Sequence, residues 1–261
     1  MADPLRLIRK TTVSESLSFT PAAPYYDQTR GGEARGRKIA DALAPEFTRA
    51  HPVCDVGMGT GVVALGIADA GFDVYGLDLS HAMLRFARAR LGPVAVNANA
   101  TNIPFRDGAF RQAYSVWVLH VTRDQESVFS EVARILCPGG RYAVVPGTIL
   151  FDPHPVNEVL AEVQRRTAHI DDLTDTLVPK AERAGFRVMT VSELSRSVHE
   201  HSPEQVATAL ERGWMFHMWG VEDDEWRRTV LPAVEALRAL PAADQPTART
   251  TRRQLLVLER R

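Results

Sequence analysis

The chain has 261 residues, of which 45% are hydrophobic and 24% are charged. These proportions are typical of globular proteins and argue against a disordered chain. There are 31 Lys and Arg residues against 32 Asp and Glu, a formal net charge of −1, which argues against nucleic acid as the main partner.

No apolar run is long enough to span a membrane, and the N-terminal segment lacks the apolar core of a secretory signal. We therefore expect a soluble, cytoplasmic protein without a membrane partner. Cys54 and Cys137 lie in apolar runs, so we expect reduced thiols in the core. The triplet His199-Glu200-His201 lacks further ligands at matching spacing, and we expect no metal site.

Strand-like and helix-like segments alternate from residue 51 to residue 146. A polar N-terminal arm and a helical pattern around residues 39–43 precede them. The strands are expected at 52–57, 72–80, 93–100, 112–121 and 141–145, with helices at 61–71, after Ser80 and from Asp124 or Gln125 to Pro138. Such alternation predicts a parallel sheet with helices on both faces.

After Gly147 strand-like and helix-like segments no longer alternate regularly. We expect helices at 155–170, from Ser202 onward and at about 223–240, the last one broken or kinked at Pro232. Strands are expected at 187–191 and 255–259. The stretch 239–253, rich in Ala, Pro, Thr and Arg, is expected to be a surface loop.

A glycine-rich loop, Asp55-Val56-Gly57-Met58-Gly59-Thr60-Gly61, follows the first strand and opens a helix. Glycines let the backbone turn tightly and approach a ligand closely. Asp78 ends the second strand, where a carboxylate can accept both hydroxyls of a ribose. Loop and acid together predict an adenosine-type ligand at the carboxyl ends of parallel strands.

Two cofactor classes fit this arrangement. Dinucleotide folds use G-x-G-x-x-G, whereas this loop reads G-x-G-x-G with Val62 in place of the third glycine. Asp55 at the head of the loop suits a cationic ligand better than a pyrophosphate. The residues therefore favour S-adenosylmethionine, and NAD stays as the alternative.

Four ordered segments resemble class I S-adenosylmethionine-dependent methyltransferases, in particular the small-molecule branch that includes ubiquinone and menaquinone methyltransferases. They are VCDVGMGTG, VYGLDLS, NATNIPFRDGAF and RILCPGGRYAVV. The resemblance implies a Rossmann-like, doubly wound α/β sheet of seven strands, mostly parallel with an antiparallel last strand. We expect one domain, with an N-terminal arm and helices at 1–50, a cofactor-binding core at 51–150, and the remaining strands with a helical lid of about 200–240 at 151–261.

The resemblance also implies cofactor contacts. Gly57, Gly59 and Gly61 would lie under the methionine moiety with Asp55 near its ammonium; Asp78 would bind the ribose, and Leu79, Asn99 and Ala100 the adenine; Ser115, Val116 and Trp117 would line the sulfonium. Asn99 stands where the family commonly has Asp, Arg111 replaces a usual Asp, and the bulky Met58 is expected to narrow the pocket.

Upstream, Tyr25-Tyr26-Asp27-x-x-Arg30 resembles a family element that covers the cofactor. Tyr26 and Arg30 would contact it, with the guanidinium facing its carboxylate. The alternative interpretation is a solvated, charged helix start.

His120 is the first choice for a catalytic base because it follows the fourth strand; otherwise it lines the pocket. His154 follows the fifth strand and is a possible acceptor contact, as is Tyr25. The cluster Trp214-Met215-Phe216-His217-Met218-Trp219 predicts either the core of a helical lid or an apolar acceptor pocket with His217 as a second polar group.

The sequence thus predicts methyl transfer to O or N of a small organic molecule, an apolar or aromatic secondary metabolite. A non-methylating cyclase or binding protein on the same fold, and an NAD-dependent oxidoreductase, are the alternatives. The oligomeric state is left open.

Overall fold

The computed structural model describes residues 23–168, 171–213 and 221–261. Its strands form one sheet in the order β3-β2-β1-β4-β5-β8-β6, with β7 paired to β8. The strands are β1 (Val53–Val56), β2 (Val74–Asp78), β3 (Ala95–Asn97), β4 (Phe110–Val116), β5 (Leu136–Val145), β6 (Leu150–Phe151), β7 (Phe186–His201) and β8 (Thr247–Arg260).

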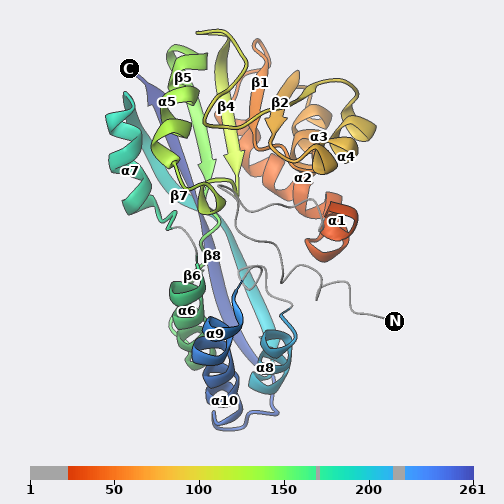
Figure 1. The fold of residues 1–261 in the computed structure, drawn as a ribbon, viewed down its shortest axis with the longest axis vertical. Coiled ribbons are helices and arrows are strands. Elements are labelled where there is room, and N and C mark those ends of the chain that lie inside the picture. The colour runs from red at the N-terminus through yellow and green to blue at the C-terminus, as the bar shows by residue number, and fades with distance from the viewer. Residues whose placement is uncertain (1–22, 169–170, 214–220) are drawn as a thin grey trace.

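Helices flank the sheet and form a separate lobe below it (Figure 1). They are α1 (Tyr26–Thr29), α2 (Gly32–Leu43), α3 (Val62–Asp69), α4 (His81–Leu91), α5 (Gln125–Ile135), α6 (Pro155–Thr167), α7 (Thr174–Arg183), α8 (Pro203–Glu211), α9 (Asp223–Glu225) and α10 (Leu231–Arg238). No helix of the described ranges is both long and apolar enough to cross a bilayer.

Parallel pairing joins β3, β2, β1, β4 and β5, and β8 runs antiparallel to both β5 and β7. The expected Rossmann-like, mostly parallel sheet with an antiparallel last strand is confirmed, and the two-residue strand β6 adds to the expected seven. The direction of strand order reverses beside β1, between β2 and β4. Ligands of open α/β sheets bind at the carboxyl ends of the strands at such a reversal.

Each face of the sheet is covered by a hydrophobic core. One core joins the sheet to α5 and α7, and the other joins it to α2, α3 and α4. Helices α2 and α3 pack closely because two glycines face the contact. A Cβ on Gly36 would lie 2.4 Å from the carbonyl oxygen of Val62, and one on Gly66 would lie 2.6 Å from Cβ of Ala40.

Strands β7 and β8 form a long two-stranded ribbon that leaves the sheet and reaches the helical lobe (Figure 1). The expectation of a surface loop at 239–253 is wrong over its second half, because Thr247–Arg253 belong to β8. The Thr and Arg side chains of this segment give no regular spacing of apolar residues, but β-branched threonines favour a strand.

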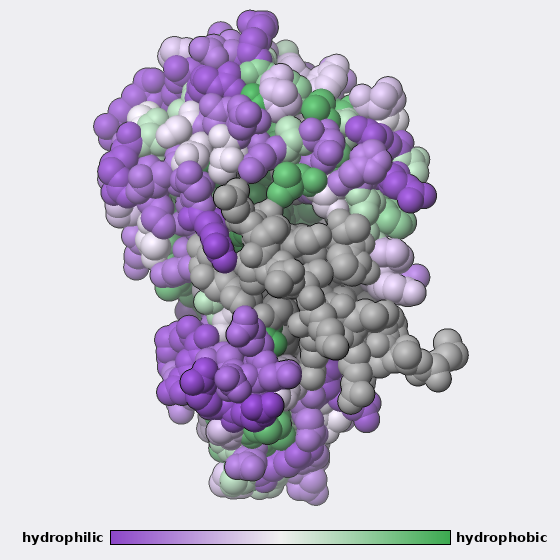
Figure 2. Space-filling model, viewed as in Figure 1, coloured by the Kyte–Doolittle hydropathy of each residue, from purple (hydrophilic) through white to green (hydrophobic). Residues whose placement is uncertain are grey.

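The helical lobe consists of α6, α8, α9 and α10 with the five-residue π-helix Trp226–Val230, and it has its own apolar core. Its surface in Figure 2 is mainly hydrophilic. The expected break at Pro232 takes the form of that π-helix, with Pro232 in the first turn of α10. A proline without N–H cannot close the ordinary helical bond at this point.

Candidate functional site

The glycine loop between β1 and α3 is held against β2. The amides of Gly57 and Met58 both donate to the carbonyl of Leu77, each at 2.9 Å. Gly57 has φ +87°, and a Cβ there would lie 2.3 Å from Cγ2 of Val118. Gly59 has φ +58° with open space where its Cβ would be, so the loop leaves room for a ligand at its middle glycine.

Asp78 closes the loop from the end of β2. One carboxylate oxygen accepts from the Gly59 amide at 2.8 Å and the other from Ser80 at 2.7 Å. Burial raises the pKa of Asp78, while these two amides act to lower it. Each oxygen keeps a further lone pair, so the carboxylate can still accept from two ribose hydroxyls.

Asn97, at the end of β3, was not anticipated from the sequence. Its amide nitrogen donates to the carbonyls of Asp78 and Leu79, both at 2.9 Å. This contact fixes the backbone that presents the ribose acid and the exposed Leu79 side chain. A single Asn after a short strand carries no local signal for such a role.

Asp55 is fully enclosed at the end of β1. The Tyr114 hydroxyl donates to it at 2.7 Å. Burial raises the pKa of Asp55 to about 7; the Tyr114 bond opposes this rise and the nearby Asp78 adds to it. A ligand cation beside this carboxyl would favour its ionised form.

The Tyr-Asp-x-x-Arg element contacts the loop through its acid. Asp27 accepts from the Thr60 hydroxyl at 2.6 Å and from Arg90 at 2.6 Å, and Arg90 also donates to the Thr60 carbonyl at 2.8 Å. The interpretation as a merely solvated helix start is therefore wrong for Asp27. Tyr25 in the same element is exposed.

Trp117 stands at the end of β4 with φ +56°, a strained value for a bulky residue. The guanidinium carbon of Arg35 lies 4.3 Å from the centre of its ring and that of Arg253 lies 5.1 Å from it. Arg35 also forms a side-chain hydrogen bond with Tyr26. Three segments that are distant in sequence thus meet at one indole.

Arg30 belongs to the same positively charged group. Burial lowers its pKa to about 10, with further contributions from Arg35 and Arg253. Burial also lowers the pKa of Arg253 to about 10, and Arg35 adds to the effect. Arg35 and Arg253 were not predicted as site residues, since isolated arginines on a helix and a late strand resemble a solvated surface.

His120 lies in the short helix Leu119–Val121 after β4. It packs on Gly147, where a Cβ would lie 2.3 Å from Nδ1 of the imidazole. Burial lowers the pKa of His120 to about 4; Asp172 opposes the shift, while Arg253 and Arg30 add to it. Asp172 itself accepts from the amides of Gly147 and Thr148.

Other predicted contacts have structural partners. Ser115 is buried against the Tyr142 hydroxyl at 2.8 Å, and the Asn99 side-chain oxygen accepts from the Thr101 amide in a local turn. His154 caps α6 by accepting from the Val156 amide. Val116 and Ala100 pack at the edges of the two cores.

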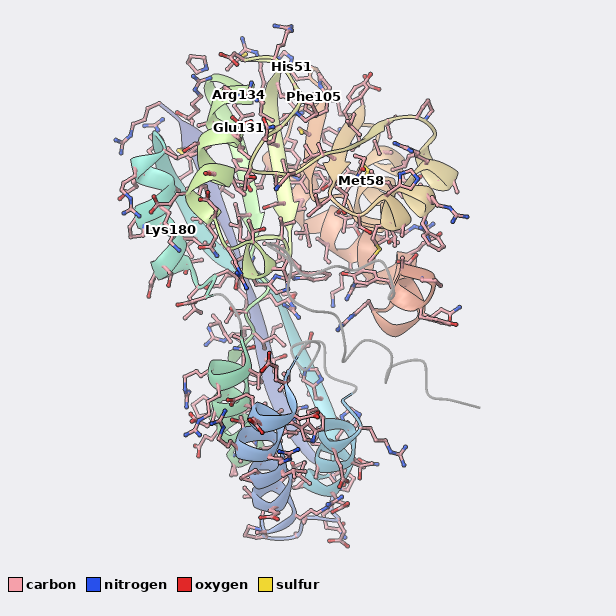
Figure 3. All side chains as sticks on the ribbon, viewed as in Figure 1. His51, Met58, Phe105, Glu131, Arg134 and Lys180 are labelled. Carbon is pink, nitrogen blue, oxygen red and sulfur yellow. The ribbon has the colours of Figure 1, made fainter. Side chains whose placement is uncertain are left out.

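Met58 is buried in the core, and a Cβ on Gly76 would lie 2.5 Å from its methyl carbon. That it narrows the cofactor pocket stays a prediction. Met58 is labelled in Figure 3. The predicted contacts Trp214, Met215, His217 and Met218, with the rest of their cluster, lie outside the described residues.

One of the segments that resemble the family stabilises the fold. Arg134, from RILCPGG, bonds to Glu131 and to the carbonyls of Ile103 and Phe105. Figure 3 places Glu131 and Arg134 at the end of the sheet away from the helical lobe. These contacts hold the segment that leads into β4 rather than a ligand.

Comparisons with known proteins find methyltransferases similar to this chain. Residues 54–144 match a family model described as a methyltransferase domain. A demethylmenaquinone methyltransferase from Renibacterium salmoninarum is 32% identical over 133 residues, covering 48% of this chain and 55% of that protein. The O-methyltransferase cnsE of Penicillium expansum is 28% identical over 181 residues, covering 64% and 62%.

The fold is shared more widely. The solved structure of the cyclase SpnF has a TM-score of 0.58 with 17% identity, over 93% of this chain and 94% of that one. The chain spans between about a quarter and two thirds of the length of the curated relatives that it matches.

The sheet reversal, the glycine loop and the acids that end β1 and β2 define a nucleoside-binding α/β domain. Residues 54–144 match the methyltransferase family model, and the two named relatives are methyltransferases, which places this part of the chain among S-adenosylmethionine-dependent methyltransferases. The open space at Gly59, the lone pairs of Asp78 and the buried Asp55 fit S-adenosylmethionine, which is the cofactor of this family.

Proposed function

We propose that this protein transfers a methyl group from S-adenosylmethionine to an oxygen or nitrogen atom of a small, natural-product-like molecule. The observation that carries the proposal is the bond between Asp78 and the Gly59 amide, which sets a ribose acceptor beside an open glycine loop. The relatives named as quinone and O-methyltransferases support a small acceptor.

The bound cofactor would supply an activated methyl group, so the chain's own residues chiefly bind and orient. Asp78 would accept the ribose hydroxyls, and Leu79, 51% exposed, offers an apolar surface for the adenine. Asp55 would pair with the ammonium group of the cofactor's methionine moiety. Asn99 and Ala100 would border the adenine edge.

The acceptor would lie at the carboxyl ends of β4 and β5, beside Trp117 and His120. His120 is uncharged at neutral pH because burial holds its pKa near 4. It can therefore accept a hydrogen bond from an acceptor hydroxyl or amine. Gly147 fixes the imidazole by close contact.

Calorimetry with S-adenosylhomocysteine and with NAD tests the cofactor. We expect S-adenosylhomocysteine to bind and NAD not to bind. Incubation with methyl-labelled cofactor and candidate metabolites then tests the reaction. Label in the product is expected; product without label would favour the cyclase alternative and overturn methyl transfer.

A further inference from the structure

His120 is held by two contacts that belong to one buried polar network. Gly147 lies so close to the imidazole that a Cβ there would be 2.3 Å from Nδ1. The carbonyl of Leu119, the residue before His120, accepts from Nε2 of the buried Gln125 at 2.9 Å. The first contact fixes the ring, and the second fixes the backbone turn that carries it.

Asp172 sets the position of Gly147. This carboxylate is fully buried. One of its oxygens accepts from the Gly147 amide at 2.5 Å, and the other accepts from the Thr148 amide at 2.9 Å and from the Thr148 hydroxyl at 2.5 Å. Hydrogen bonds to a carboxylate are among the stronger ones in proteins. Asp172 therefore fixes the turn after β5 that packs on the imidazole.

Gln125 connects the two contacts. Its side-chain nitrogen also donates to the carbonyl of Asp171 at 3.1 Å, and its side-chain oxygen accepts from Nζ of Lys180 on α7 at 2.6 Å. Lys180 is labelled in Figure 3. Because Asp171 directly precedes Asp172 in the chain, the two contacts on His120 close into one ring.

Asp172 also acts on the charge of His120. Burial lowers the pKa of His120 to about 4; Asp172 opposes this shift, and Arg253 and Arg30 add to it. A nearby carboxylate stabilises an imidazolium. The network therefore both fixes the imidazole and favours its protonated form, which is what a proton acceptor needs.

We propose that Asp172 is a positioning residue for methyl transfer, which holds Gly147 against His120 and stabilises the imidazolium that forms there. This inference rests on the proposed function and deepens it. Methylation of an O–H or N–H acceptor releases one proton, which His120 would take up and later release to water. Gln125 supports the same imidazole through the backbone of its turn.

The first test is an NMR titration of the His120 imidazole in the full chain saturated with S-adenosylhomocysteine. Loss of the signal in His120→Ala assigns it. The wild-type ring is expected to titrate with a pKa of about 4. In Asp172→Asn this pKa should fall by about one unit or more, because the carboxylate that favours the charged form is lost. A pKa that stays constant or rises would overturn the proposal.

The second test is a double-mutant cycle on turnover, with methyl-labelled cofactor and the metabolite that accepts label fastest in the assay described above. Asp172→Asn should lower kcat about 10–100-fold, because a displaced base is costly. The KM for the cofactor should change less than about threefold. In a His120→Ala background the same substitution should lower kcat less than about threefold, since its effect passes through the imidazole.

Asp124→Asn is the matched control. Asp124 is an exposed carboxylate that accepts from the Ser127 amide and caps α5, so this variant should keep the wild-type kcat. Effects of Asp172→Asn and His120→Ala that multiply in the double variant would overturn the proposal, because Asp172 would then act on the fold alone. Thermal unfolding verifies that each variant is folded.

Gln125→Met provides a second variant if Asp172→Asn does not fold. It removes the bonds to Leu119 and Asp171 without changing the carboxylate. We expect a lower kcat with an unchanged affinity for S-adenosylhomocysteine, and a wild-type kcat in the folded variant would overturn the proposal. Absence of label transfer by the wild type would instead contradict the proposed function itself.

Discussion

Asp55 and Asp78 end neighbouring strands, yet their surroundings prepare them for different partners. Asp78 accepts two backbone amides, whereas Asp55 has one phenol hydroxyl and little solvent. Amide donors stabilise the carboxylate, while burial disfavours it. Asp78 is thus suited to neutral hydroxyls, and Asp55 to a ligand that carries its own positive charge.

Asp78→Ala tests the ribose contact. We expect S-adenosylhomocysteine to bind more weakly by roughly 1–3 kcal/mol, because charge-assisted hydrogen bonds are lost. Calorimetry measures the change. Asp107→Ala, which removes an exposed acid paired with Arg134, is the control; equal affinities for Asp78→Ala and wild type would show that the ribose binds elsewhere.

Asp55 makes folding pH-dependent. In the folded state the pKa of Asp55 is raised to about 7, so the protonated carboxyl favours folding. This contribution to the free energy of unfolding is complete below about pH 4 and is lost as the pH rises through about 7. Asp55→Asn should therefore gain stability relative to the wild type by about 3 kcal/mol between pH 5 and pH 8. Urea unfolding at each pH measures the gain, and parallel pH curves would contradict it.

His120→Ala tests the base. If His120 accepts the acceptor's proton, turnover should fall about 10²–10⁴-fold. Because burial, Arg253 and Arg30 lower the pKa of His120 against the effect of Asp172, the wild-type rate should show no loss near pH 6.5. Steady-state rates from pH 5 to 9 measure this pH dependence. Near-normal turnover in the variant would show that His120 only lines the pocket.

The residues that sequence reasoning located are those with a local pattern: the glycines, Asp55 and Asp78. Asn97, Arg35 and Arg253 make equally specific contacts but stand alone in their segments. Asp27 lies in a recognised element, but its partner Thr60 is 33 residues away, and the partner of Arg253, Gly147, is 106 residues away. Only the folded chain brings such pairs together.

At the scale of elements, α2 is fixed by the shape of its contact with α3. The same helix carries Arg35, so its distance from the sheet determines where that guanidinium lies. Gly36 and Gly66 permit the approach. A larger side chain would push α2 outward, away from Trp117.

Gly36→Ala tests this contact. The added methyl would meet the Val62 carbonyl at 2.4 Å, and overpacking should cost about 1–3 kcal/mol despite the better helix propensity of alanine. Urea unfolding should show this loss, and calorimetry a weaker affinity for S-adenosylhomocysteine. Ala34→Ser, on the exposed side of α2, should change neither; wild-type stability in Gly36→Ala would mean that α2 relaxes freely.

Strands in which apolar residues recur at regular spacing were predicted well, and strand segments made of polar residues were not. The buried strand β1 lies within its expected range, and β4 overlaps its expected range but begins at Phe110 and ends at Val116. Strands β7 and β8 were recognised only near their paired apolar ends, because their outer halves lie in a two-stranded ribbon. There the pairing is set by the partner strand rather than by burial.

At the scale of the molecule, the ribbon joins a sheet with two covered faces to a lobe with its own core. In its outer half β7 pairs only with β8, and β8 has a second partner only at Thr251 and Arg252, which pair with β6. Isolated two-stranded pairs are marginal in water. We expect amides at 195–201 to exchange with solvent faster than those at 142–145 in central β5. Hydrogen exchange followed by mass spectrometry measures this, and equal protection would mean that the two regions open together.

The pairing of His201 with Thr247 means that the chain leaves the ribbon and re-enters it at adjacent positions, about 5 Å apart. Residues 202–246 therefore form an insertion that begins and ends at neighbouring positions of the ribbon. Such a segment can be exchanged between relatives, or replaced by a short turn, without altering the register of the sheet. The helices of this segment can thus vary while the glycine loop and Asp78 stay unchanged.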